Sequence, residues 1–101
     1  MSEGGNLRKY ELMVIHRPAT AEDDVRSHIE EVNKAISDVG TLTTTDFWGK
    51  RRFAYEIEKV NEGFYSVFDF EGDNDLLDTL NRSLTLHDAV MRHKIVRMDE
   101  N

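Results

Sequence analysis

The sequence of 101 residues contains no cysteine, a single proline and no apolar run of membrane-spanning length. Without cysteine the chain has no disulfides, thiolate metal ligands or cysteine nucleophiles, which suits a reducing compartment. Its first residues lack the cationic stretch, apolar core and small-residue cleavage site of a signal peptide. We therefore expect no export, no membrane span and a cytoplasmic location.

Positive charge is also scarce overall. The chain has 20 acidic and 13 basic side chains, a formal net charge of -7, and 39% hydrophobic residues. This hydrophobic content is enough for one ordinary core at this length, so we expect one domain. An even spread of negative charge would disfavour binding to a polyanion, because binding to phosphates depends mainly on electrostatics.

The charge is not spread evenly along the sequence. Acidic residues gather in 22–38 and 71–78, two stretches with helical periodicity, whereas many basic residues lie in stretches with strand character. Those cations are Arg8, Lys9, Lys50, Arg51, Arg52, Arg92, Lys94 and Arg97. If the strands form one sheet with the helices on one side, a negative protein can still present a positive patch.

Strands are predicted where apolar and polar residues alternate or β-branched residues gather. These stretches are 7–15, 41–59, 64–70 and about 89–98. Gly49 interrupts the second stretch, where it indicates either a bulge in one long strand or a short break between two. Residues 59–63 then predict a hairpin connection.

Two amphipathic helices are predicted between these strands, because apolar residues recur there at spacings of three and four. In the first helix, Thr20 and the acid three residues later fit a capping box, and Gly40 ends the helix. The second helix runs from Asp73 or Asn74, either of which can cap it, to Leu84. The apolar stripe of the second helix comprises Leu77, Leu80 and Leu84.

The order strand, helix, strand, strand, helix, strand is that of the α+β ferredoxin-like fold, βαββαβ. It predicts a four-stranded antiparallel sheet with both helices on one face and the other face open. The apolar residues that alternation assigns to the open face are Met13, Ile15, Tyr65 and Val67, which suggests that something covers part of it. We expect a disordered N-terminal extension over 1–6, a single domain over 7–99 and a short C-terminal end at 100–101.

No pattern in the sequence points to catalysis. The histidines are His16, His28, His87 and His93. They are not spaced as metal pairs on a helix or strand, and we assign them structural or surface roles. No serine lies in a nucleophile elbow, and no glycine-rich loop leads from a strand into a helix to hold phosphate. We expect no enzyme activity, no metal and no cofactor.

The stretch DFWGKRRFAY, residues 46–55, interleaves cations with aromatic rings. This combination neutralises phosphates and stacks on bases in RNA-binding surfaces. The alternative is structural: Phe53 and Tyr55 belong to the core of an amphipathic strand, while the cations protect an exposed sheet edge. Composition favours neither interpretation over the other.

Four segments carry a family resemblance: LRKYELMVIHRP, DFWGKRRFAYEIEK, GFYSVFDF and LTLHDAVMRHKIVRMDE. Together they resemble the bacterial small-subunit ribosomal protein six family, from about Leu7 to Glu100, and the motif around Trp48 is the most specific part. The resemblance implies a ferredoxin-like fold and a structural role, without catalysis, in the bacterial ribosome. It also implies two partners, the central domain of small-subunit (16S-type) rRNA and small ribosomal subunit protein eighteen.

Applied to this sequence, the resemblance implies two overlapping sets of site residues. The residues expected at the interface with the partner protein are Trp48, Arg51, Arg52 and Tyr55. The residues expected to contact RNA phosphates are Arg8, Lys9, Lys50, Arg51, Arg52, Arg92 and Lys94. Such phosphate contacts position a protein without reading base sequence. We expect the chain to be a monomer before assembly.

Two other classes of protein fit the same order of elements. An enzyme of the acylphosphatase kind needs an arginine and an anion-binding loop after the first strand. Arg17 lies there, but HRPAT lacks the glycines of a phosphate cradle. A regulatory ligand-binding protein would instead dimerise through its sheet. Turnover of an acyl phosphate and the size of the particle in solution separate these alternatives from the ribosomal one.

Overall fold

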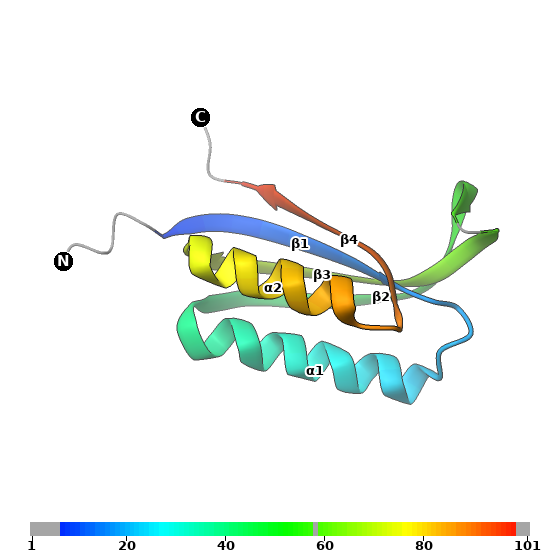
Figure 1. Ribbon diagram of the computed structural model, residues 1–101, viewed down its shortest axis with the longest axis horizontal. Helices are drawn as coiled ribbons and strands as arrows, with labels where there is room; N and C mark the ends of the chain where they lie inside the picture. Colours follow the sequence, from blue (N-terminus) through cyan, green and yellow to red (C-terminus); the bar gives the residue numbers. More distant parts are fainter. Residues whose placement is uncertain (1–6, 58, 99–101) are drawn as a thin grey trace.

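The computed structural model describes residues 7–57 and 59–98. Its elements are β1 (Arg8–His16), α1 (Glu22–Val39), β2 (Thr41–Ile57), β3 (Val60–Gly72), α2 (Asn74–Leu86) and β4 (Val90–Arg97). The strands form one sheet in the order β2-β3-β1-β4, and each neighbouring pair is antiparallel. Both helices lie on one face of the sheet and leave the other open (Figure 1), which confirms the ferredoxin-like fold.

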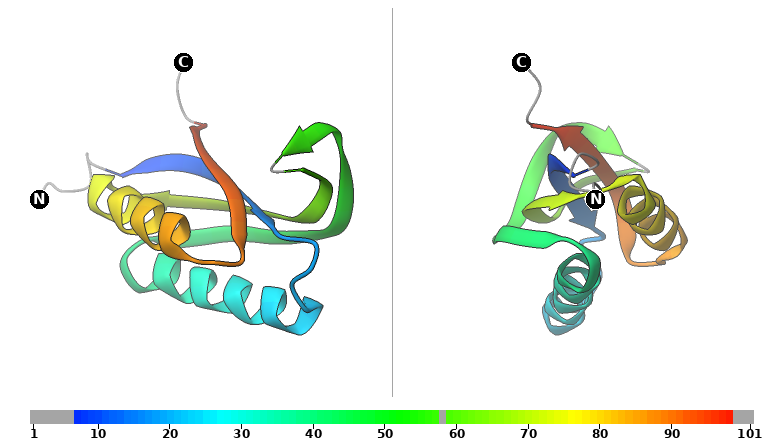
Figure 2. Two further views of the ribbon diagram at one scale, coloured as in Figure 1. Left: turned by 45° about the vertical axis from the view of Figure 1, so that its right-hand side comes forward. Right: turned by 90° about the vertical axis from the view of Figure 1, so that its left-hand side faces the viewer.

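The predicted ends of the chain are outside this description. The extension expected at 1–6 and the end expected at 100–101 fall on residues that the structure does not describe. The bounds 7–99 for a single domain stay a prediction. Within the described residues, the view along the long axis in Figure 2 shows both helices on the same side of the strands.

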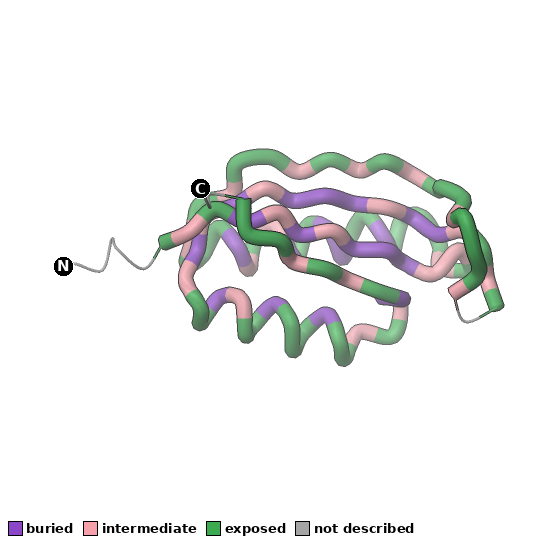
Figure 3. Tube along the Cα trace, turned by 90° about the horizontal axis from the view of Figure 1, so that it is seen from above, coloured by how far each residue is buried: buried purple, intermediate pink, exposed green. Residues whose placement is uncertain are grey.

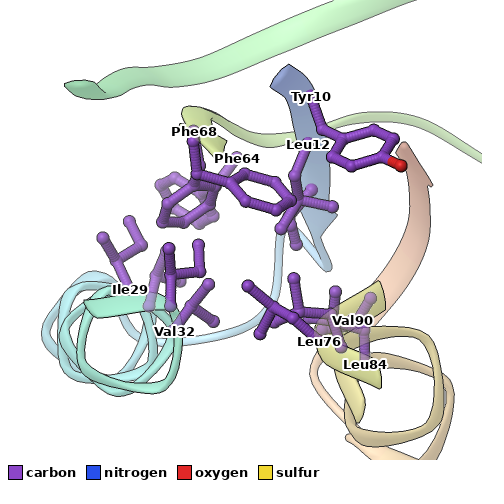
Figure 4. Packing of buried hydrophobic residues seen from close by; sticks show 14 residues of the cluster. Tyr10, Leu12, Ile29, Val32, Phe64, Phe68, Leu76, Leu84 and Val90 are labelled. Atoms are coloured by element: carbon purple, nitrogen blue, oxygen red, sulfur yellow. The ribbon is translucent and has the colours of Figure 1, made fainter. Parts of the chain in front are cut away.

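The core lies between the helices and the sheet. Alternate residues of β1 and β3 point to the helices, so Leu12 pairs with Phe68 across the two strands and both are fully buried. Side chains of α1 and α2 pack against these strand residues from below, as Figure 4 shows for Ile29 and Leu76. Burying a side chain of this size stabilises the fold by roughly 1.5–3 kcal/mol.

The start of α1 differs from the prediction. Its N-cap is Ala21, which makes no side-chain cap bond, so the expected capping box at Thr20 is wrong. The backbone N–H of Thr20 donates to the carbonyl of Arg17 at 3.0 Å, which places Thr20 in the turn before the helix. Three acids in the first turn of α1 complement the helix dipole. Gly40 ends the helix as predicted. Glycine suits this position because a Cβ there would collide with the carbonyl of Glu71 on β3.

The second helix begins as predicted and buries a different set of leucines. Asp73 is the N-cap, and its Oδ1 accepts from the backbone N–H of Leu76 at 3.0 Å. The helix continues two residues beyond the predicted end, to Leu86. Its buried residues are Leu76, Leu80 and Leu84. Leu77, which was predicted in that stripe, is only partly buried.

The longest strands form a hairpin that extends beyond the helices. β2 is continuous, and a register shift between Phe47 and Gly49 with φ 83° at Gly49 confirms the bulge in one long strand. The strand returns through Lys59, at φ 66°, and Ile57 pairs with Val60. The hairpin predicted at 59–63 is therefore placed too late, since β3 already begins at Val60.

We call residues 49–57 and 59–63 the arm. In Figures 1 and 2 the arm curls away from the helices toward the open face of the sheet. Figure 3 looks onto that open face and shows mostly exposed residues along the outer strand and the arm, with buried residues along the inner strands. The open face of the sheet and the arm are thus the parts of the strand layer that the helices leave uncovered.

Candidate interface with RNA and protein

Two aromatic pairs lie on opposite faces of the sheet next to the bulge at Gly49. Just before it, the ring of Phe47 stacks on Phe64 on the helix side, with centroids 6.2 Å apart. The next residue, Trp48, stacks on Tyr65 on the open side, with centroids 6.1 Å apart and rings 4° from parallel. Alternation along the strand produces this division, because successive side chains point to opposite faces.

The three consecutive cations after the bulge do not form one patch. The Nζ of Lys50 lies 5.1 Å from the centroid of Phe64, so this ammonium is on the helix side. The guanidinium carbon of Arg51 lies 5.8 Å from the centroid of Trp48 on the open side, and its Nε donates to the carbonyl of Trp48 at 3.2 Å. Arg52 pairs with Glu62 in the sheet, and alternation places it on the same side as Lys50.

The aromatic group on the open side includes a third ring. Phe53, on the arm, lies 5.9 Å from Tyr65, and Trp48 is 45% exposed. We call Trp48, Phe53 and Tyr65 the aromatic cluster. Beside it, Ile15 and Val67 are each only 6% exposed although no helix covers them. The arm, bent over this face, therefore provides part of the cover that the apolar residues of the open face required.

Tyr55 is a surface residue. Its side chain is 73% exposed on the outer half of the arm. The structural alternative, in which both Phe53 and Tyr55 are core residues, is therefore wrong for Tyr55. Phe53 is half-buried, but against the aromatic cluster rather than in the core between sheet and helices.

The cations of β4 are on the open side. Arg92 pairs with Ile15, and Lys94 pairs with Met13, which are the outward-facing residues of β1. Both cations are exposed and lie on a strand at the sheet edge. Arg51, Arg92 and Lys94 thus share the open side with the aromatic cluster.

The cations at the start of β1 have more acidic surroundings. Lys9 is on the open side, but it lines a hollow of about 340 Å³ together with Glu11, Asp69 and Glu71. Arg8 points to the other side and lines a polar hollow of about 370 Å³ at the start of α2. The other residues of that hollow are Tyr10, Asp73, Asn74, Asp75 and Arg97. The structure therefore separates both residues from the cations of the arm.

No pattern in the sequence indicated directly that Tyr65 and Phe53 would contact Trp48. Tyr65 was expected on the open face, but its partner depends on the register of β2 and β3, which the bulge shifts. The available signal was Gly49, because a glycine inside a strand often marks a bulge. The contact between His16, His28 and His87, described below, was likewise missed, because these residues are far apart in the sequence.

Fold and surface together define a class: a small ferredoxin-like domain with an open sheet face and an exposed arm. Among residues 7–57 and 59–98, no helix has the length and apolar content to cross a membrane, and no cluster of His, Asp or Glu is arranged to hold a metal ion.

The family follows from comparison with known proteins. The family described as "Ribosomal protein S6" matches residues 9–97. Small ribosomal subunit protein bS6 of Arthrobacter sp. (strain FB24) is 42% identical over 95 residues, which cover 93% of this chain and 94% of that protein. The bS6 of Clostridium botulinum (strain 657 / Type Ba4) is 37% identical over 94 residues, covering 92% of this chain and 100% of the relative.

A solved structure agrees with these relatives. The crystal structure of 30S ribosomal protein S6 from Thermotoga maritima matches with a TM-score of 0.85 and 33% identity, covering 91% of this chain and 88% of that one. The chain therefore belongs to the ribosomal protein S6 family, which confirms the resemblance found in the sequence. Members of this family are structural proteins of the ribosome rather than enzymes.

Proposed function

We propose that this chain is a structural protein of the bacterial small ribosomal subunit, in the cytoplasm, and that it binds the central domain of small-subunit (16S-type) rRNA together with small ribosomal subunit protein eighteen. Family membership supports the ribosomal role. The observation that supports contact with two partners at once is the opposite orientation of Lys50 and Arg51, which point to opposite sides of the arm.

The open side of the arm suits a protein partner. Trp48 is half-exposed, Arg51 lies over its ring, and Tyr55 is exposed nearby in the sequence. Half-exposed tryptophan, tyrosine and arginine are the residue types that most often dominate the binding energy of protein interfaces. The partner interface that we propose comprises Trp48, Arg51 and Tyr55 from this side, together with Arg52, which follows Arg51 and points to the helix side of the arm.

Cations on several strands suit RNA phosphates. Lys50 and Arg52 are exposed on the helix side of the arm, and Arg92 and Lys94 are exposed on β4. With Arg51, and with Arg8 and Lys9 at the other end of the sheet, these are the phosphate contacts that we propose. Because the net charge is -7, the chain alone is expected to bind RNA weakly, and strong binding is expected only with a basic partner present.

The salt dependence of RNA binding tests this assignment. Each phosphate contact changes the slope of log affinity against log salt by roughly -0.7 to -0.9. Replacing Lys50, Arg51 and Arg52 together by alanine is therefore expected to flatten the slope of the ternary complex by about two units. If the variant loses binding to the partner protein while the RNA slope is unchanged, the three residues belong to the protein interface instead.

A matched control keeps the same change of charge. Arg26, Lys34 and Arg82 lie on the exposed surfaces of α1 and α2. Their joint replacement by alanine also removes three positive charges, but it is expected to leave the salt slope within about half a unit of the original value. Equal flattening by both variants would show a general charge effect. Tight and specific binding of RNA by this chain alone would overturn the proposed joint recognition.

A further inference from the structure

Three histidine rings meet at one corner of the fold, away from the aromatic cluster. His16 ends β1, His28 lies on α1, and His87 is the C-cap of α2 just before β4. His28 and His87 are stacked with centroids 3.7 Å apart, and His16 meets both edge-on, at 5.0 and 6.5 Å. His16 is 1% exposed and His28 is 4% exposed. We call these three side chains the histidine corner.

The hydrogen bonds at the corner fit three neutral rings. His16 Nε2 and His28 Nδ1 are 2.8 Å apart, and His87 Nδ1 accepts from the backbone N–H of Ala89 at 3.2 Å. His16 Nδ1 is buried without a hydrogen-bond partner. The arrangement that buries no unpaired N–H at His16 has His16 donating from Nε2 to His28 Nδ1. His28 and His87 then carry their protons on Nε2.

An additional proton has no favourable position in this arrangement. On His16 Nδ1 it would be a buried N–H without an acceptor. On His28 Nδ1 it would face the N–H at His16 Nε2. His16 would then have to carry its own proton on its unpaired Nδ1 instead. On His87 Nδ1 it would oppose the N–H of Ala89. In each case a positive charge would also lie among imidazole rings that are largely removed from water.

The charged groups around the corner only partly favour protonation. Glu31 on α1 raises the pKa of His28, but burial and His87 outweigh it and lower that pKa. On the turn between α2 and β4, Asp88 is exposed. Arg17, which follows β1, donates from Nε to the carbonyl of Asp88 at 3.0 Å and brings a positive charge to the corner. Burial, followed by His28 and His87, lowers the pKa of His16 from 6.5 to about 4.

Backbone bonds cross the corner and hold the start of β4. The N–H of Arg17 donates to the carbonyl of Ala89 at 2.8 Å, and the N–H of Val90 donates to the carbonyl of His87 at 3.0 Å. His16 directly precedes Arg17 in the chain, and His87 accepts the bond from Val90, so the same segments carry the packed rings and these backbone bonds. Separation of the rings is therefore expected to loosen the connection between α2 and β4.

We propose that the histidine corner is a proton-sensitive latch, which holds the connection between α2 and β4 while the buried rings of His16 and His28 are neutral and opens locally when one of these two is protonated. The latch acts on β4, an edge strand that pairs only with β1 in the sheet. A metal site is not an alternative here, because the stacked rings of His28 and His87 do not converge on one ion, in agreement with the absence of any suitable cluster among the described residues.

The direction of the pH effect follows from the lowered pKa of His16. Between pH 6.5 and about 4, the open corner binds a proton at His16 that the closed corner does not. Stability of the closed corner is therefore complete above pH 6.5 and declines as the pH falls toward 4. At pH 5.5 the equilibrium between closed and open corner is expected to shift toward the open state by roughly tenfold.

Hydrogen exchange of single backbone amides tests the latch. Protection of the Arg17 and Val90 amides, corrected for the intrinsic exchange rate, is expected to fall about tenfold from pH 7.5 to 5.5. The Gly40 amide, which donates to Ile36 at the far end of α1, is the internal control and is expected to keep its protection. Unchanged protection at Arg17 and Val90 overturns the proposal. An equal loss at Gly40 also overturns it, because the chain would then unfold as a whole.

Two variants separate the corner from other histidines. H16L removes the buried imidazole and is expected to remove most of the pH dependence at the Val90 amide. H93Q is the matched control, because His93 bonds to Asn81 outside the corner, and it is expected to retain the tenfold change. Titration of the His16 ring by NMR in the unaltered chain does not depend on how H16L folds. A midpoint below pH 5 supports the latch, and one near 6.5 overturns it.

Discussion

The two faces of the sheet bury their apolar side chains by different means. On the helix side, Leu12 and Phe68 are fully buried beneath α1 and α2. On the open side, Ile15 and Val67 are covered by strand residues and the arm, and Trp48 stays half-exposed. The charges divide similarly, since the helices carry eight carboxylates and three cations, whereas the strands carry eight cations and six carboxylates. The helix-covered face therefore holds the main core cluster, whereas the open face leaves cations and part of the Trp48 ring exposed.

The largest loss of stability is expected from a substitution on the helix-covered face. Phe68→Ala removes a ring that is 0% exposed at the centre of the core. The free energy of unfolding is expected to fall by roughly 3–5 kcal/mol, because both transfer energy and a cavity contribute. Urea unfolding at pH 7 measures this loss. A change below about 1 kcal/mol would show that the core relaxes around the missing ring and that the contrast between the faces is overstated.

A smaller effect is expected where the arm meets the open face. A Cβ at Gly63 would lie 2.7 Å from Ile15 Cγ2 and 2.8 Å from the carbonyl oxygen of His16. Gly63→Ala is therefore expected to cost roughly 1–3 kcal/mol in urea unfolding, because a backbone atom cannot easily move away. The comparison variant is Gly49→Ala, where a Cβ meets nothing within 4 Å but φ is +83°. Its expected cost is about 1 kcal/mol, from backbone strain alone.

The helix layer can be weakened without touching the core. Asp73→Ala removes the cap bond to the backbone N–H of Leu76 and is expected to cost about 1 kcal/mol. Asp75→Ala is the control, since it removes a carboxylate from the same first turn without removing the cap bond. Thermal unfolding distinguishes the two variants. Equal losses would assign the effect to the helix dipole rather than to the cap.

The smallest effect on stability is expected on the open face, where it tests the difference between the two faces most directly. Trp48→Ala removes a half-exposed ring from the aromatic cluster and is expected to cost less than about 1 kcal/mol in urea unfolding. Binding of this variant to the proposed partner, small ribosomal subunit protein eighteen, is nevertheless expected to weaken at least tenfold, because tryptophans at interfaces often carry much of the affinity. A titration with the purified partner measures this. Loss of stability equal to that of Phe68→Ala would mean that the ring belongs to the core.

The order of elements could be predicted because it depends on local patterns. Alternation over β1 and the spacing of apolar residues in α1 are short-range signals, and both gave the correct element. The capping box at Thr20 was wrong because a turn of the chain from Arg17 competes for that residue. The hairpin was placed too late because the chain turns at Lys59, a residue other than glycine with a positive φ, and no local pattern marks that position.

The arrangement of the candidate site was harder to predict. Lys50 and Arg51 are adjacent in the sequence, and strand alternation places them on opposite sides. Which of the two points to the helices can be predicted only when the position of the bulge is known. The histidine corner has no local signal at all, because β1, α1 and the end of α2 come together only in the folded chain. Contacts between distant segments are what single-sequence patterns do not contain.

The strand order has a consequence for how the protein is made. Of the described strands, β4 at residues 90–97 is synthesised last, and it lies beside β1, at residues 8–16, in the sheet. During translation, one edge of β1 therefore stays without this partner until residues 90–97 have left the exit tunnel. Pairing between segments so far apart in the sequence slows folding. Until it forms, the unpaired edge of β1 makes the nascent chain prone to aggregation.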